Sequence, residues 1–209
     1  MTLFDPSAYS DLDYDSLKTF CSTCQKCDLA ATRTQVVFGH GPVPSLIMAV
    51  GEGPGEQEDL QGRPFVGKAG QLLTKIFESA GIDREKQVYI TNVVKCRPPA
   101  NRTPLPSETA ACKGYLMRQI HLVQPRILIL LGSPAVKTVL NTPEPISKLR
   151  GQWIHTPVSY MTDSLSIMPM FHPSYLLRNP SREVDSPKWQ SWQDIREVKA
   201  ALDFYQSSL

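Results

Sequence analysis

Four short segments of the chain are almost entirely apolar, and polar or glycine-rich sequence flanks each of them. They are Leu46–Val50, Val88–Val94, Ile127–Leu131 and Ile167–Phe171. Within each segment the apolar residues follow one another instead of alternating with polar ones. This pattern is typical of parallel strands that are covered on both faces of a sheet. We therefore predict four strands at these positions.

Segments with helical spacing separate the predicted strands. Residues 70–80 place four apolar side chains on one helical face, and Gly81 then offers a suitable C-cap. Residues 106–123 predict a second helix, which Pro106 opens and which ends before Pro125. A third helix opens at Ser133, and 189–205 predicts a closing helix.

Strands that alternate with helices indicate an α/β fold. We expect a three-layer sandwich in which helices flank a central, mostly parallel four-stranded sheet, with right-handed crossovers. The 209 residues suit one domain, with 1–20 as an N-terminal extension that is helical or flexible. In such folds ligands bind at the carboxyl ends of the strands, so the loops after the strands hold the candidate chemistry.

Composition adds little to this picture, but the distribution of charge adds more. With 41% hydrophobic residues and a formal net charge of +2, the whole chain does not indicate a nucleic-acid partner. Lys95, Arg97 and Arg102 nevertheless share a stretch without carboxylates, and Arg178 and Arg182 share another. Such basic loops suit either phosphate contacts or plain solvation. The chain shows no signal-peptide pattern and no apolar run that would span a bilayer, so we expect a cytoplasmic protein without a membrane partner.

A glycine-rich loop follows the first predicted strand. Glycines at 51, 53 and 55 would let a ligand approach the backbone N–H groups. The loop lacks the Gly-Lys-Ser/Thr ending of a phosphate-binding loop, and its four acidic residues would repel a phosphate. A turn with solvated acids explains it almost as well. Phe65 follows between Pro64 and Gly67, where it either stacks on a base or fills the core.

Polar residues mark two further strand ends. Asn92 interrupts an apolar strand, so its amide must bind a neighbouring backbone or a ligand that offers both a donor and an acceptor. His172 ends the fourth strand, where it is either structural or donates to an oxygen that gains negative charge. Beyond it, Leu176 or Leu177 is suited to insert into a base stack, with Arg178 on a phosphate.

The chain has five cysteines, and in a reducing cytosol they indicate metal binding more than disulfides. Cys24 and Cys27 form a C-x-x-C pair, Cys96 and Cys112 complete a set of four, and Cys21 is a fifth. Four thiolates hold either zinc or an iron–sulfur cluster, and their spacing barely separates the two. A thioredoxin-like pair is disfavoured because no predicted strand precedes Cys24.

Five blocks of the sequence together resemble the signature of the family 4, or iron–sulfur, uracil-DNA glycosylases. In chain order they are Gly51-Glu52-Gly53-Pro54-Gly55 with Glu58-Asp59, Gly62-Arg63-Pro64-Phe65-Val66-Gly67, Asn92-Val93-Val94-Lys95-Cys96-Arg97-Pro98-Pro99, Asn101-Arg102-Thr103-Pro104 and His172-Pro173-Ser174-Tyr175-Leu176-Leu177-Arg178. Each block alone is weak, but the set covers the chain from about Cys24 to about Arg182 in the family's order. The resemblance implies a DNA-repair enzyme with the uracil-DNA glycosylase fold. It would flip uracil out of single- or double-stranded DNA, hydrolyse the N-glycosidic bond, and release free uracil from an abasic site.

The resemblance also implies a role for each site residue. Phe65 would stack on uracil, Asn92 would read its edge, and His172 would donate to O2. Glu58 would help to exclude the methyl group of thymine, and Glu52 would act on water or offset charge on the sugar. The full implied sets are catalytic Glu52, Asn92 and His172; uracil-binding Gly51, Glu52, Gly53, Glu58, Phe65, Asn92 and His172; DNA-binding Lys95, Arg97, Arg102, Leu176 and Arg178; and 4Fe-4S cluster ligands Cys24, Cys27, Cys96 and Cys112, with Cys21 as a spare.

Other readings of the chain stay open at this point. One is a non-catalytic DNA-binding module stapled by an iron–sulfur cluster or zinc, but simple phosphate binding would not require Glu52, Phe65, Asn92 and His172 together. A zinc hydrolase would need an open metal position with His or carboxylate ligands. A related branch that links covalently to DNA has Gln in place of Glu52 and an inserted Arg-Ile-His stretch, and both are missing here. We therefore expect a hydrolytic enzyme, and a monomer.

Overall fold

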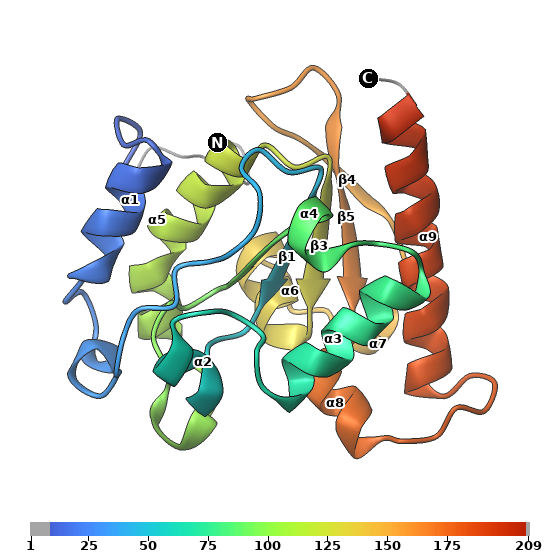
Figure 1. Ribbon diagram of the computed structural model, residues 1–209, viewed down its shortest axis with the longest axis horizontal. Coiled ribbons are helices and arrows are strands. Elements are labelled where there is room, and N and C mark those ends of the chain that lie inside the picture. Colours follow the sequence, from blue (N-terminus) through green and yellow to red (C-terminus); the bar gives the residue numbers. More distant parts are fainter. Residues whose placement is uncertain (1–8, 208–209) are drawn as a thin grey trace.

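A five-stranded sheet forms the centre of the computed structural model, which describes residues 9–207 (Figure 1). The strand order is β2-β1-β3-β5-β4, and all neighbours are parallel except β4 and β5. The strands are β1 (Ile47–Gly51), β2 (Val88–Asn92), β3 (Ile127–Leu131), β4 (Ile154–Pro157) and β5 (Ser164–Met170).

Helices cover both faces of this sheet. Figure 1 shows α1 and α5 on one side and α3 and α9 on the other. The helices are α1 (Tyr14–Ser22), α2 (Glu56–Gln61), α3 (Lys68–Ser79), α4 (Arg84–Gln87), α5 (Pro106–Val123), α6 (Ser133–Leu140), α7 (Ile146–Leu149), α8 (Pro173–Arg178) and α9 (Pro187–Ser207), with 3₁₀ turns at Asp28–Ala31 and Pro99–Asn101.

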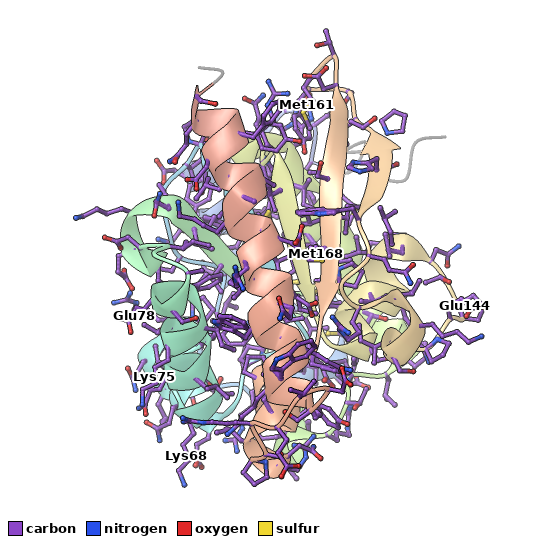
Figure 2. All side chains as sticks on the ribbon, turned by 90° about the vertical axis from the view of Figure 1, so that its right-hand side faces the viewer. Lys68, Lys75, Glu78, Glu144, Met161 and Met168 are labelled. Carbon is purple, nitrogen blue, oxygen red and sulfur yellow. The ribbon has the colours of Figure 1, made fainter. Side chains whose placement is uncertain are left out.

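Alternate residues of each strand feed two separate hydrophobic cores. In β1, Met48 and Val50 pack with residues of α1, α5 and α6, whereas Ile47 and Ala49 pack with residues of α3 and α9. Figure 2 shows α9 running across the second face beside Met168 of β5. Because both faces are covered, the inner strands need no polar positions, which explains their continuous apolar sequence.

The predicted α/β sandwich with a mostly parallel sheet is confirmed, and the sheet has one strand more than predicted. β4 pairs only with β5, in antiparallel register, and its residues alternate between exposed and half-buried. Such a short edge strand contains polar residues and a proline, here His155 and Pro157, so it lacks the apolar run by which the other strands are recognised.

Within the predicted N-terminal extension, residues 9–11 form a turn and residues 14–20 belong to α1. α1 begins after Asp13, whose carboxylate accepts a hydrogen bond from the backbone N–H of Ser16, and it buries Leu17 and Cys21. Residues 1–8 lie outside the described part of the chain. Among the described helices, none is both long and apolar enough to cross a membrane.

A buried ion pair fixes α9 to the segment after α7. Arg150 donates to both carboxylate oxygens of Asp194, whose side chain is only 2% exposed. Next to Arg150, Gly151 has a φ of +71°, and a Cβ there would lie 2.6 Å from Asp194 Oδ1. The chain therefore turns sharply against α9 at this point.

Removing one partner of this pair should destabilise the fold strongly. We expect Asp194→Ala to lower the free energy of unfolding by about 3–5 kcal/mol, because it leaves a mostly buried guanidinium without its counter-charge. The control is Asp163→Ala, which breaks an exposed pair with Arg126 and should cost less than about 1 kcal/mol. Urea unfolding of both variants measures the difference, and equal losses would contradict it.

Candidate active site

The ends of β1, β2 and β5 surround a cavity of about 340 Å³. The parallel register sets Gly51, the last residue of β1, directly beside Asn92, the last residue of β2. Fifteen residues line the cavity: Glu52, Gly53, Pro54, Gly55, Glu58, Phe65, Ala69, Asn92, Pro98, Asn101, Arg102, Pro104, His172, Ser174 and Arg178. This volume falls in the range of small-molecule sites, which open α/β sheets place at the carboxyl ends of their strands.

Phe65 forms one wall of the cavity, on a backbone held in the left-handed region. Its φ is 54°, which is rare for a residue other than glycine. The carboxylate of Glu58 accepts from the N–H groups of Val66 and Gly67 at 2.8 Å each, and from Gly55 at 3.1 Å. Arg84 donates to the Phe65 carbonyl at 2.8 Å from the other side. These bonds hold the loop in a conformation that its sequence alone would not favour.

Two glycines make room for the phenyl ring and its backbone. A Cβ on Gly51 would lie 2.5 Å from both Phe65 Cζ and Asn92 Oδ1. A Cβ on Gly70 would lie 1.9 Å from the Phe65 carbonyl oxygen. Gly51 therefore lies behind the cavity wall and is not among the lining residues. The direct ligand contact that was predicted for Gly51 does not fit this position. Its contribution is to let Phe65 and Asn92 approach each other.

Asn92 carries an unsatisfied buried acceptor. The residue is 1% exposed, and its Oδ1 has no hydrogen-bond partner among the described residues. Leaving a buried polar atom unpaired costs about 1–3 kcal/mol, so such atoms in native proteins call for an explanation. Because Asn92 lines the cavity, a bound molecule with an N–H donor would satisfy this oxygen.

The hydrogen bonds of His172 fix its tautomer. Its Nδ1 accepts from the backbone N–H of Ser174 at 3.1 Å and lies 2.8 Å from the Ser174 hydroxyl. A neutral imidazole that accepts at Nδ1 carries its proton on Nε2. Burial, together with the positive charge of Arg178, lowers the pKa of His172 to about 4, while the negative charge of Glu58 opposes the shift. His172 is therefore a neutral donor at physiological pH, with its ring 5.6 Å from that of Phe65.

Two carboxylates line the cavity, and their surroundings differ. Glu58 is committed to three backbone N–H groups, so it shapes the loop. Glu52 is half-buried, and burial raises its pKa, while a hydrogen bond with Thr103 opposes the shift. Glu52 is thus the carboxylate that remains available to a bound molecule or a water.

The predicted DNA-binding cations lie in different surroundings. Arg178 is exposed at the cavity, and Arg102 lines it while donating to both oxygens of Glu108 at 2.7 and 2.9 Å. Arg97 lies outside the lining set and donates to Asn101. Lys95 is 1% exposed, so its predicted contact with a DNA phosphate is wrong.

The predicted base-stack wedge, Leu176, is also wrong. Leu176 lies on the buried face of α8 and is 1% exposed, whereas the next residue, Leu177, is 44% exposed. α8 has only six residues, and helical spacing turns neighbouring side chains to different faces. The sequence offered both leucines, and only burial separates them. Leu177 is the exposed one of the two.

The five cysteines gather at a second, smaller cavity, formed by α1, the 24–33 segment, the loop after β2 and α5. All five line it, together with Arg33, whose Nη1 lies 3.3 Å from Cys96 Sγ. Thiolates are the ligands of zinc and of iron–sulfur clusters, so the donor set fits either. Among the described residues, no three metal-ligating side chains converge closely enough for a single ion.

Lys95 links this cysteine cavity to the end of β2. Its ammonium donates to Thr91 Oγ1 at 2.7 Å and to the Asn92 carbonyl at 2.6 Å, and its chain borders the cavity. Burial lowers the pKa of Lys95 to about 8, and the charges of neighbouring thiolates oppose that shift. Lys95 therefore makes its hydrogen bonds inside the protein, to Thr91 and Asn92, and not at the surface.

Ser174 and Arg84 are functional residues that the sequence did not indicate. Ser174 sets the tautomer of His172, and its only sequence signal is a hydroxyl two residues after the histidine, at a helix start. Arg84 contacts Phe65 from 19 residues away, and nothing in the local pattern marks this contact.

Comparisons with known proteins agree with this geometry. The sequence model of the "Uracil DNA glycosylase superfamily" matches residues 38–196. The "Type-4 uracil-DNA glycosylase" of Thermotoga maritima is 48% identical over 162 residues, which cover 77% of this chain and 81% of that protein. The protein of the same name from Saccharolobus solfataricus is 44% identical over 86% of this chain and 82% of its own length. That from Sulfurisphaera tokodaii is 42% identical over 80% and 77%, respectively. The chain therefore belongs to the type-4 uracil-DNA glycosylases of this superfamily.

Proposed function

We propose that this protein binds uracil-containing DNA, turns the uracil nucleotide into the cavity, and hydrolyses the bond between C1′ of the sugar and N1 of the base. The products are free uracil and an abasic site. The observation that carries this proposal is the unpaired, buried Oδ1 of Asn92, which lines one cavity with Phe65 and His172. Incubating the protein with a uracil-containing oligonucleotide, then cleaving abasic sites with alkali, tests it directly. An uncut strand would instead support a DNA-binding module without catalysis.

The side-chain amide of Asn92 suits the edge of uracil. Uracil presents an N3–H donor next to the O4 acceptor, so the amide oxygen accepts from N3 while the amide nitrogen donates to O4. Cytosine presents an acceptor and a donor in the reverse order, and would leave buried groups unpaired on both sides. A site of this kind rejects a close analogue strongly because unpaired groups are costly. Phe65 supplies the surface on which the base stacks.

His172 supports the departing base. When water adds to C1′, the electron pair of the C1′–N1 bond passes to uracil, and negative charge develops on N1 and O2. A neutral imidazole with its proton on Nε2 donates a hydrogen bond to O2 without transferring that proton. The Ser174 contacts hold this tautomer before substrate binds, so the imidazole needs no rearrangement during the reaction.

Glu52 supplies the carboxylate for the sugar side of the reaction. Glu58 is occupied by three backbone donors, which leaves Glu52 to orient or deprotonate the water, or to offset positive charge on the sugar. We propose no thymine-excluding contact by the Glu58 carboxylate itself. Its effect on specificity passes through the loop that positions Phe65.

DNA contacts come from the residues around the cavity mouth. We propose Leu177, in place of Leu176, as the side chain that fills the space left by the flipped base. Arg178 is placed to bind a neighbouring phosphate, and Arg102 and Arg97 add positive potential while they hold their own loop. Flipping costs a few kcal/mol, least where uracil is mispaired or single-stranded.

We propose that Cys24, Cys27, Cys96 and Cys112 hold a 4Fe-4S cluster. The cavity that the cysteines share and the family to which the chain belongs support this assignment. When bound, the cluster supplies a rigid cross-link between the N-terminal segment and the loop that follows Asn92. The uracil chemistry is carried by the chain's own residues.

Changing the amide of Asn92 tests base reading. We expect Asn92→Asp to slow uracil excision roughly 10- to 100-fold, because the carboxylate faces O4 without a donor, at a cost of about 1–3 kcal/mol. The same variant should begin to release cytosine, whose amine donates to a carboxylate. Alkali cleavage of strands with one uracil or one cytosine measures both rates, with exposed Asn141→Asp as the control. Normal uracil excision by Asn92→Asp would show that Asn92 does not read the base.

Removing the imidazole tests the leaving-group role. We expect His172→Ala to slow excision by roughly two orders of magnitude, the usual effect of losing one such donor. Because the pKa of His172 is lowered to about 4, its neutral form persists at every pH above that value. Titration of His172 should therefore add no break near pH 6.5 to the pH profile of the excision rate. The unmodified protein and His172→Ala should have profiles of the same shape in that range. The control is His40→Ala, at an exposed pair with Glu85. An unchanged rate in His172→Ala would remove this residue from the mechanism.

Substituting single cysteines tests the metal assignment. We expect Cys96→Ala and Cys24→Ala to lose most of the four irons per chain and the brown colour, whereas Cys21→Ala should keep both. Iron, zinc and acid-labile sulfide are measured in each purified variant. Zinc in the unmodified protein, or iron loss in Cys21→Ala alone, would contradict the ligand set.

A further inference from the structure

A groove of about 520 Å³ lies between α3 and α9, away from the residues discussed so far. Its walls are mainly apolar: Leu72 and Ile76 of α3 face Trp189 and Trp192 of α9. Leu176, on the inner side of α8, closes one end. In Figure 2, α3 and α9 lie side by side on this face, with Lys75 projecting from α3.

The tryptophans give the groove flat aromatic surfaces. Trp192 is 42% exposed, which is unusual for the largest apolar side chain. The guanidinium of Arg196 lies 4.6 Å from the centre of its ring, so one face of the indole already carries a cation. A planar, electron-rich ring that stacks on the other face of Trp192 would lie close to that positive charge.

Three cations surround these rings. Lys75, Arg182 and Lys188 line the groove, and none of them makes an ion pair with another described residue. Among the described residues, none of those that line the groove is a carboxylate, although Glu78 lies one turn beyond Lys75 on α3. Unpaired cations around an apolar floor favour an anion that carries a flat or apolar group.

Ser191 provides an independent indication of a ligand. It is 1% exposed and lines the groove, and its hydroxyl has no hydrogen-bond partner among the described residues. A serine inside a helix usually bonds the carbonyl one turn earlier when nothing else satisfies it. Its unpaired hydroxyl therefore offers a polar contact at the floor of the groove.

The groove also continues the surface around the active-site cavity. α8 separates the two: Ser174 and Arg178 line the cavity on one side, and Leu176 lines the groove on the other. A DNA strand that passes over Leu177 and Arg178 of α8 would therefore lie between the cavity and the groove. An acidic peptide shares some of this chemistry, but nothing would tie it to the cavity.

We propose that this groove binds a nucleotide that flanks the flipped uracil, with its base against Trp192 and its phosphate among Lys75, Arg182 and Lys188. This inference rests on the proposed function, since it assumes that the DNA strand runs over α8. Stacking on an aromatic ring tolerates every base, so the groove would strengthen binding without reading sequence. It would thus make activity depend on the length of the strand.

Strand length is the variable that tests this site. The substrates are single strands with uracil in the centre, either five or about twenty nucleotides long. We expect Trp192→Ala to raise KM roughly 10-fold on the long strand, with kcat unchanged, and to leave the short strand unaffected. Lys75→Gln with Lys188→Gln should reduce the salt dependence of binding to the long strand. Lys18→Gln, an exposed change on α1, is the control for charge.

Binding to a uracil-free strand separates this inference from the proposed function. The affinity for a fluorescently labelled, uracil-free strand of twenty nucleotides, measured by fluorescence anisotropy, should weaken roughly 10-fold in Trp192→Ala, and this readout needs no catalysis. Length-dependent binding without any excision would sink the proposed function and keep the groove. Equal effects of Trp192→Ala on both lengths, no effect on either, or groove binding by an acidic peptide but not by DNA would overturn the inference.

Discussion

The register of the parallel sheet is the constraint on which the site depends. Because β1 and β2 end at the same level, Gly51 and Asn92 are neighbours, and the loops that follow both strands open at one edge. A slip of one residue would turn Asn92 to the opposite face of the sheet and into the core. The two hydrophobic cores, which take alternate residues of each strand, therefore fix the orientation of the Asn92 amide.

Hydrogen bonds in the loops then fix the conformations of side chains that the sheet positions only approximately. Phe65 adopts a left-handed backbone because Glu58 and Arg84 bind the loop from two sides. Ser174 similarly fixes the proton of His172. Neighbouring residues thus set the conformation of Phe65 and the tautomer of His172, so this part of the cavity is pre-organised before a ligand binds.

Much of this could be predicted from the sequence, because continuous apolar runs identify buried strands and the motifs at their ends identify the site. The burial of individual side chains could not be predicted in this way. Lys95 reads as a surface cation from its basic neighbours, yet it points inward to Thr91 and the Asn92 carbonyl. Leu176 and Leu177 are equivalent in sequence and differ only in which face of α8 they occupy. The sequence does not predict β4, because an edge strand pairs on one side only and needs no apolar run.

The short interval between Asn92 and Cys96 has an evolutionary consequence. Lys95 bonds the Asn92 carbonyl from within this interval, while its side chain borders the cysteine cavity. A single inserted or deleted residue here would shift the amide and the thiol relative to each other, and would misplace the lysine as well. Natural variation in length should therefore accumulate in exposed connections such as 141–145, whereas the number of residues from Asn92 to Cys96 should stay fixed.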